Sequence, residues 1–279
     1  MGAKKARLSA FLAKHPFCCF CGGSAAATTQ DHIPPRGIFA EKKWPEGYVF
    51  PGCTSCNNGS ARDDALVAFL SRMNVDAADG TVEAMEWNKL LTSIREHYPG
   101  LAREMILSAN EVRRWMRKHG VAKPFGLTYG EVPMIRIPEV IVAAVRRFNN
   151  KLLRALHYKH TGMIIPSTAW THLQWWTNAN LLAREFPREI AEMMPGRAAL
   201  KRGKVLLGNQ FGYSFGTGND GTLGAYLATF RKSFVVVGVV VFDAALMVDI
   251  DEKAVDSTVQ HVVEARVEVD LAPVTNSDT

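Results

Sequence analysis

The chain has 279 residues, of which 47% are hydrophobic and 22% charged, and its formal net charge is +6. This composition is ordinary for a globular protein with a core of its own. The longest apolar run, 234–242, is less than half of the roughly 20 residues that a membrane-spanning helix needs. The first residues do not form a secretory signal. We therefore expect a soluble, cytoplasmic protein of one or two domains with no membrane partner.

The positive charge is concentrated at the start of the chain. Residues 1–62 hold eight basic side chains against three acidic ones, a surplus of five charges, so the remaining residues carry about one. The same stretch contains every cysteine. Such a distribution is typical of a module that binds a polyanion, although a basic surface without any partner has the same appearance.

The first region, from about Met1 to Asn74, is predicted to be a short basic helix, a loop rich in cysteine, glycine and proline, and a second helix. The basic helix is expected over 3–14, because Pro16 follows. The second helix is expected over 60–73, with Asp63 and Asp64 in its first turn, where acidic groups suit the helix dipole.

The second region, about 82–195, has mainly helical periodicity, with helices expected over 82–97, 108–118 and 138–158. The last of these has a basic stripe of Arg147, Lys151 and Arg154, which fits a solvated face better than a track for phosphates. Trp170, Trp175 and Trp176 are expected to pack in the core rather than to stack on bases.

The third region, about 203–273, changes to the pattern of β-strands. Five strands are expected at 205–208, 211–215, 224–230, 234–241 and 262–271, separated by turns rich in glycine, asparagine and aspartate. The final residues, 274–279, are expected to be disordered. The predicted fold class is therefore α+β: an N-terminal zinc-containing module, a helical region, and a mainly antiparallel C-terminal sheet.

Four of the five cysteines form two CxxC motifs, Cys18–Cys21 and Cys53–Cys56, about thirty residues apart. In a reducing compartment, clustered cysteines favour a metal over disulfides, and four thiolates suit tetrahedral Zn²⁺. Four sulfur ligands leave no open position, so the predicted zinc is structural. Cys19 lies between two of the predicted ligands and is expected to be a free thiol or a small packed hydrophobic side chain.

Between the two motifs the sequence reads Asp31-His32-Ile-Pro-Pro, and Asn57 directly follows the last cysteine. In this order, the motifs resemble the HNH (ββα-metal) endonucleases. The resemblance is to the branch whose zinc is bound by four cysteines, as in the phage recombination endonucleases that cut branched DNA. It covers roughly residues 18–73, about a fifth of the chain. It implies a nuclease module at 1–74, followed by an accessory region at 75–279 of unknown role.

The resemblance implies a role for each matching residue. His32 is the general base that activates a water molecule, and Asp31 and Asn57 are ligands of a catalytic Mg²⁺ or Mn²⁺ ion. The implied function is metal-dependent hydrolysis of phosphodiester bonds in DNA, in a phage, mobile-element or defence setting. Asp31 and His32 are neighbours, and on a regular strand their side chains would point to opposite faces, so we expect a bend there.

The third position of the HNH motif is not identified by the sequence. Many family members have a histidine or asparagine on the closing helix, where this chain offers Asn58, Ser60, Asp63 and Asp64. For phosphate contacts, the weaker candidates Arg36 and Arg62 remain. Two alternatives stay open: a non-catalytic zinc module that binds nucleic acid or protein, and a nuclease that acts on RNA.

Overall fold

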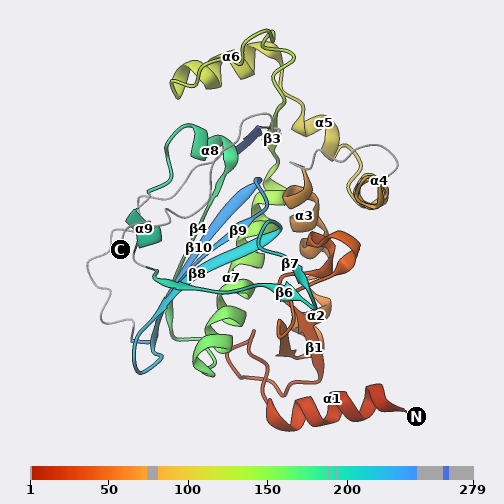
Figure 1. Ribbon diagram of the computed structural model, residues 1–279, viewed down its shortest axis with the longest axis vertical. Helices are drawn as coiled ribbons and strands as arrows, with labels where there is room; N and C mark the ends of the chain where they lie inside the picture. The colour runs from red at the N-terminus through yellow and green to blue at the C-terminus, as the bar shows by residue number, and fades with distance from the viewer. Residues whose placement is uncertain (1, 74–80, 188, 193, 244–259, 264–279) are drawn as a thin grey trace.

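The structure is a computed structural model that describes residues 2–73, 81–187, 189–192, 194–243 and 260–263. It is a mixed α/β protein in which helices predominate in the first half and an antiparallel sheet in the second (Figure 1). The helices are α1 Ala3–Lys14, α2 Thr54–Asn58, α3 Ala61–Arg72, α4 Val82–His97, α5 Leu101–Met105, α6 Ala109–Lys118, α7 Glu139–Thr161, α8 Asn178–Leu182 and α9 Glu189–Glu192.

The main sheet has five antiparallel strands in the order β4-β10-β9-β8-β5. The remaining strands form three two-stranded ladders, β1 with β2, β3 with β11, and β6 with β7. The strands are β1 Thr29–His32, β2 Val49–Gly52, β3 Met134–Ile137, β4 Trp170–Thr177, β5 Gly196–Arg197, β6 Lys201–Arg202, β7 Val205–Leu206, β8 Phe211–Thr217, β9 Leu223–Phe230, β10 Phe234–Val241 and β11 Gln260–Val263.

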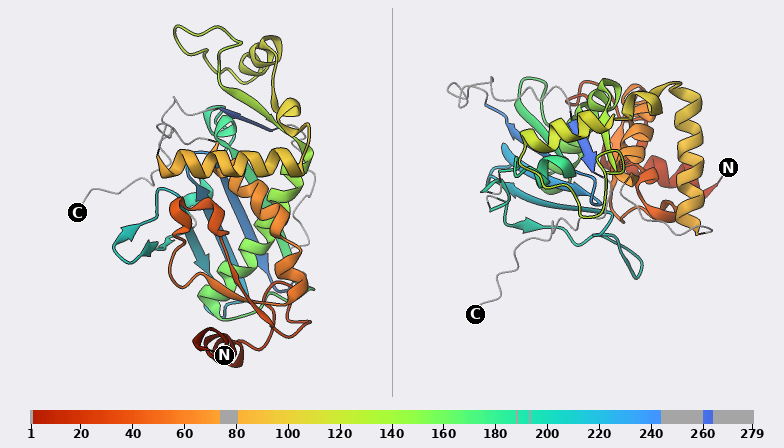
Figure 2. Two further views of the ribbon diagram at one scale, coloured as in Figure 1. Left: turned by 90° about the vertical axis from the view of Figure 1, so that its right-hand side faces the viewer. Right: turned by 90° about the horizontal axis from the view of Figure 1, so that it is seen from above.

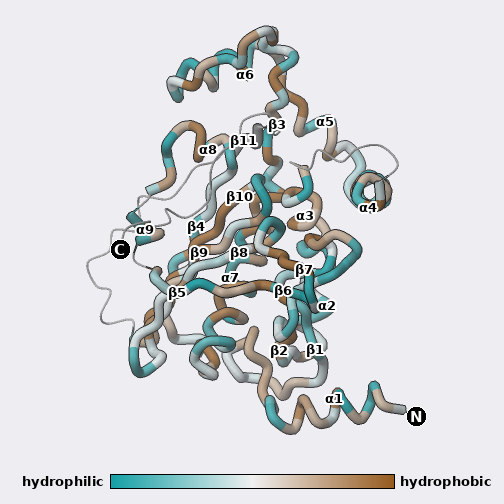
Figure 3. The backbone as a smooth tube through the Cα atoms, in the orientation of Figure 1, coloured by the Kyte–Doolittle hydropathy of each residue, from teal (hydrophilic) through white to brown (hydrophobic). Residues whose placement is uncertain are grey.

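Helix α7 joins the N-terminal part of the chain to the sheet. It packs on β10, β4 and β9 with one side and on α3 with another (Figure 2). Its apolar residues, including Ile141, Phe148 and Leu152, are almost fully buried. The cluster that contains them extends from Ile33 near β1 to Val240 in β10, so residues on both sides of the predicted boundary at 74 share one hydrophobic core. Strand β10 at its centre is mostly apolar (Figure 3).

Most predicted elements are present, and the main error is in the second region. Residues 170–177, predicted to lie in a helical region, form β4, because their side chains alternate against β10. Trp175 is buried against Phe234, as core packing requires. The strand predicted at 205–208 is the short β7, and only residues 260–263 of the last predicted strand region are described. Residues 264–271 and 274–279 lie outside the described part.

Candidate metal centre and adjoining polar site

Four cysteine sulfurs converge at one end of the β1–β2 ladder. Cys18 and Cys21 lie in a turn that continues through Gly22 and Gly23, whose positive φ angles of 70° and 76° suit residues without a side chain. Cys53 caps α2, its sulfur accepting a hydrogen bond from the backbone N–H of Cys56 at 3.4 Å. The four sulfur atoms all lie within 4.8 Å of one another.

This arrangement fits a tetrahedral zinc site. Zn–S bonds of about 2.3 Å place the sulfurs of a tetrahedron about 3.8 Å apart, so small movements would bring all four onto one ion. The prediction that these cysteines form one cluster is confirmed, and the cluster could hold a zinc ion. Cys19 points away from it into the hydrophobic core and is fully buried. Burial raises the pKa of its thiol, which therefore stays protonated.

Asp31 lies on the buried side of β1, opposite Phe50 of β2. Its carboxylate accepts a hydrogen bond from the backbone N–H of His32 at 2.8 Å and forms an ion pair with the ammonium group of Lys151 on α7. The side chains of both ion-pair partners are only 9% exposed. Each charge of so deeply buried a pair would strongly destabilise the fold if its partner were removed. The pair also joins the cysteine-containing segment to α7.

The Asn57 amide group faces the same carboxylate. One end of this amide lies 3.2 and 3.3 Å from the two carboxylate oxygens of Asp31, and the other end lies 3.1 Å from the hydroxyl of Thr29. With its nitrogen toward Asp31, the amide donates to the carboxylate. With its oxygen toward Asp31, two acceptors meet at a distance that is favourable only beside a cation. Asp31 and Asn57 are therefore close enough to bind one hard cation together.

Several further polar groups of α3 and α7 surround Lys151. Its ammonium donates to the Ser60 hydroxyl at 2.5 Å, and that hydroxyl donates in turn to Asp64 at 3.3 Å. The other carboxylate oxygen of Asp64 is buried and has no hydrogen-bond partner among the described residues. Burial raises the pKa of Asp64 to about 6, and the charge of Lys151 opposes this rise. Asp64 is therefore the acidic residue of α3 that takes part in the polar contacts around Lys151.

A cavity of about 210 Å³ opens beside these groups, lined by residues of α2, α3 and α7 that include Cys56, Ser60 and Lys151. At its rim, Arg147 donates two hydrogen bonds of 2.7 Å to the two carboxylate oxygens of Asp63. Asp63 is thus already paired, which distinguishes it from Asp64. The positive charges of Lys151 and Arg147 at this cavity are thus balanced by the carboxylates of Asp31 and Asp63.

His32 lies on the other face of β1, half-buried against the ring of Trp44 at a centroid distance of 4.8 Å. Arg36 donates to the Nε2 atom of His32 at 2.7 Å, and its guanidinium carbon lies 4.0 Å from the Trp44 ring centroid. Arg202 stacks on the same ring, also at 4.0 Å. Burial lowers the pKa of His32, and the charges of Arg36 and Arg202 add to this effect. His32 is therefore neutral at neutral pH, as a general base has to be.

The structure thus brings Asp31 and Asn57 together, but places the His32 ring on the opposite face of the strand. The bend that we expected after Asp31 is not seen, because both residues belong to the regular β1–β2 ladder. Arg62 is exposed at the start of α3. The basic stripe on α7 is a solvated face only at Arg147, which is exposed although it pairs with Asp63. Lys151 is buried against Asp31, and Arg154 is partly buried and donates to the backbone oxygen of Ile165 at 2.8 Å.

The sequence reasoning did not identify Lys151, Trp44 or Arg202 as residues near the site. The helical periodicity of α7 placed Lys151 on the basic stripe, but periodicity alone cannot show which acidic residue a lysine contacts. Trp44 lies in an irregular segment and Arg202 in the short strand β6, far apart in the chain, and the two come together only through the fold.

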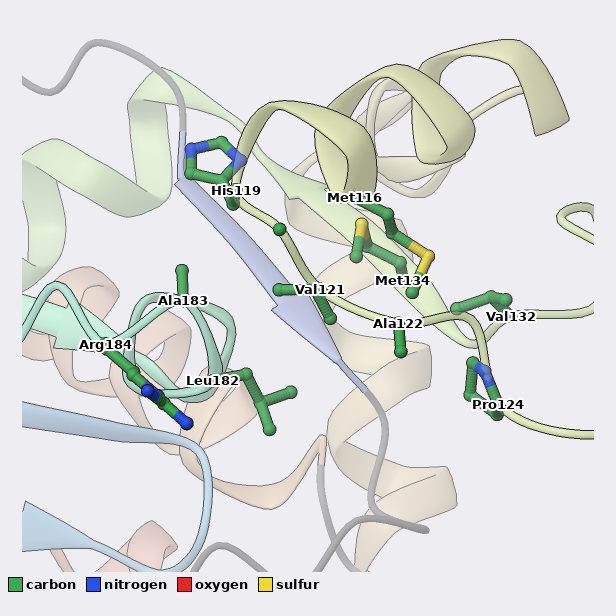
Figure 4. Close-up of a pocket in the computed structure, with 11 residues that line it drawn as sticks. Met116, His119, Val121, Ala122, Pro124, Val132, Met134, Leu182, Ala183 and Arg184 are labelled. Carbon is green, nitrogen blue, oxygen red and sulfur yellow. The ribbon is translucent and has the colours of Figure 1, made fainter.

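A second, larger cavity of about 500 Å³ lies between α6, β3 and α8, at the far end of the molecule from the cysteine cluster (Figure 4). Most of its lining is apolar, including Met116, Val121, Met134 and Leu182. Its one histidine, His119, already pairs with Glu185 at 3.2 Å. This cavity contains no cluster of groups comparable to that around Asp31.

Comparison with protein-family models, with curated proteins and with solved structures finds no match for this chain. Function therefore has to be inferred from the residues themselves. Among the described residues, no helix combines the length and the apolar character needed to cross a membrane.

Proposed function

We propose that residues 18–73 form the active site of an HNH-type endonuclease that hydrolyses phosphodiester bonds of DNA. The main support is the position of Asp31 and Asn57 beside the four cysteine sulfurs. Asp31 lies in the antiparallel β1–β2 ladder, and Asn57 lies in α2, the helix that directly follows this ladder. The order of the motifs and the closeness of Asp31 to Asn57 both support this proposal, whereas the His32 ring lies on the opposite face of β1. The basic surplus of residues 1–62 suits a polyanionic substrate.

Each group would have a distinct role in the reaction. The zinc would be structural, because all of its ligands are protein thiolates. Asp31 and Asn57 would bind Mg²⁺ or Mn²⁺, which supplies positive charge at the scissile phosphate and the leaving oxygen. Neutral His32 would accept the proton of the attacking water molecule, once the substrate draws Arg36 from its Nε2 atom toward a phosphate. Asp64, the buried acid of α3, would occupy the third position of the motif.

The ion pair between Lys151 and Asp31 adds a requirement to this proposal. A divalent cation and an ammonium group repel each other at one carboxylate. Binding of the cation would therefore shift Lys151 from Asp31 toward Ser60 and the unpaired oxygen of Asp64, which lie next to it. The oxygen atoms of Asp31 and Asn57 fit a hard cation once the Lys151 side chain has moved away from Asp31.

The test is plasmid nicking by purified zinc-loaded protein in the presence of Mg²⁺ or Mn²⁺. His32→Ala is expected to lower the rate by about 10²–10⁴-fold, the usual contribution of a general base. Zinc content and the far-ultraviolet circular dichroism spectrum should not change. His97→Ala is the matched control, because this exposed histidine of α4 bonds only within its own helix. Equal nicking by the two variants would remove His32 from the mechanism.

A substrate panel of supercoiled DNA, linear duplex DNA, single-stranded DNA and single-stranded RNA distinguishes DNA from RNA as the substrate. We expect cleavage of DNA. Cleavage confined to RNA would keep the catalytic residues and contradict the substrate.

The second candidate is a non-catalytic zinc module that binds nucleic acid or protein. One observation favours it: Asp31 is neutralised by Lys151, and the His32 ring already accepts a hydrogen bond from Arg36. In that case these residues would serve stability alone. No nicking by the wild-type protein with either cation, together with retained binding of duplex DNA, would support this candidate over the nuclease.

A further inference from the structure

The short β6–β7 hairpin, residues 201–206, reaches across from the C-terminal half to the neighbourhood of His32 (Figure 1). Four contacts hold it there. Arg202 stacks on the Trp44 ring and donates to the backbone oxygen of Trp44 at 3.2 Å. The backbone N–H of Glu46 donates to the oxygen of Lys201 at 3.0 Å, and the Glu46 carboxylate accepts from the Gly203 N–H at 2.9 Å. The hairpin is therefore fixed beside the proposed site.

The register of the hairpin separates two faces. Arg202 pairs with Val205, and Lys201 pairs with Leu206, so each pair projects from one face of the ladder. Arg202 marks the face that packs on Trp44. Lys201 and Leu206 consequently share the outer face, where Lys201 is exposed and Leu206 is 77% exposed. Lys204 is exposed in the two-residue turn, which begins at Gly203 with a φ of 56°.

The charges around this hairpin lack acidic partners. The guanidinium carbons of Arg36 and Arg202 both lie 4.0 Å from the Trp44 ring centroid. Within the described part of the chain, neither guanidinium group forms an ion pair with a carboxylate. Glu46, an acidic residue that contacts the hairpin, accepts a hydrogen bond from the backbone N–H of Gly203 in the turn. Arg36, Lys201 and Lys204 are exposed, and Arg202 lies on the Trp44 side of the hairpin, so a polyanion would meet and neutralise a cluster of positive charges here.

We propose that the β6–β7 hairpin is a duplex-binding element, with Lys201 and Lys204 on backbone phosphates and Leu206 in a groove next to the scissile bond. A two-stranded ribbon fits a DNA groove, and apolar side chains at such positions press against base steps. Leu206 is largely exposed in the free protein and would be covered by the duplex. The choice of partner rests on the proposed function, whereas the position of the hairpin does not.

The experiment measures binding of a fluorescent 30-base-pair duplex by anisotropy, with zinc-loaded protein and no Mg²⁺ or Mn²⁺, over a series of salt concentrations. Lys201→Ala/Lys204→Ala should weaken binding about tenfold or more at 100 mM salt and reduce the slope of log K against log salt by about two. Leu206→Ser should weaken binding several-fold without changing the slope, because it removes no charge.

Arg113→Ala/Arg114→Ala is the matched control. It also removes two exposed positive charges, but from α6 at the top of the view in Figure 1, well away from β6 and β7, and should leave affinity and slope unchanged. Equal effects of the two double variants would overturn the hairpin proposal, as would equal binding of single-stranded and duplex probes. If nicking persists while the hairpin variants bind normally, only the hairpin proposal fails. If the wild type neither nicks nor binds, the proposed function fails, and with it the choice of partner.

Discussion

The segment around the cysteines and the C-terminal sheet are stabilised by different means. The β1–β2 ladder has only four residue pairs, and the segment before it forms mainly turns around the four sulfurs. By contrast, β10 pairs along eight residues with β4 on one side and with β9 on the other, and it is almost wholly apolar and buried. The sheet can depend on hydrophobic burial, whereas the cysteine segment adds a cluster of four sulfurs that could hold a zinc ion. The chemistry proposed for this protein belongs to the segment with the shorter ladder.

The largest expected effect comes from removing the metal ligands. Cys53→Ser/Cys56→Ser deletes two of the four thiolates, so zinc should be lost, the β1–β2 ladder should unfold, and nicking should cease. Strands β8, β9 and β10 should stay paired, because none of the four sulfur ligands belongs to the hydrophobic core that the sheet shares with α7. Zinc content, nicking, and hydrogen exchange resolved by segment would measure these outcomes.

Cys19→Ala is the control for this prediction. Cys19 lies between Cys18 and Cys21 in the sequence, but its side chain lies in the hydrophobic core. Its replacement should therefore lower the free energy of unfolding by only about 1 kcal/mol and keep the zinc. Loss of zinc in Cys19→Ala, or its retention in the double variant, would contradict the ligand assignment.

A smaller effect is expected where the two regions meet, at the buried pair of Lys151 and Asp31. Lys151→Met leaves the Asp31 carboxylate buried without a partner, and such a change typically lowers the free energy of unfolding by about 3–5 kcal/mol. Denaturation by urea would measure it. Asp31→Asn/Lys151→Met removes both charges and should recover most of the lost stability. If Lys151→Met costs less than about 1 kcal/mol, the pair does not link the two regions energetically.

This pair also shows where sequence reasoning reaches its limit. The CxxC motifs, the Asp-His step and the strands β9 and β10 were predicted because each depends on residues close in sequence. The contact between Asp31 and Lys151 joins residues 120 positions apart, so the stripe on α7 could not be distinguished from a solvated face. For 170–177, apolar residues at mixed spacing suited a helix as well as a strand, and only pairing with β10 decides between the two.

The smallest expected effect concerns α7 where it faces the sheet, and it depends on pH. His157 is fully buried, its Nδ1 atom lies 3.2 Å from the Tyr226 hydroxyl, and its Nε2 atom has no hydrogen-bond partner within the described structure. Burial lowers the pKa of His157 from 6.5 to about 4. Because the pKa of His157 is lower in the folded protein than in the unfolded chain, its contribution to the free energy of unfolding is fully present above pH 6.5. This contribution is lost as the pH falls toward 4.

His157→Phe keeps an aromatic ring but removes the titrating group. Between pH 7.5 and pH 5, the wild type should lose about 2 kcal/mol more of its free energy of unfolding than this variant does. Comparing the two proteins at each pH cancels the acid sensitivity of the cysteine site, which both share. The exposed-site variant His97→Ala should follow the wild type. If His157→Phe does so as well, His157 is not desolvated in solution, and the apolar contacts between α7 and the sheet are looser than the structure indicates.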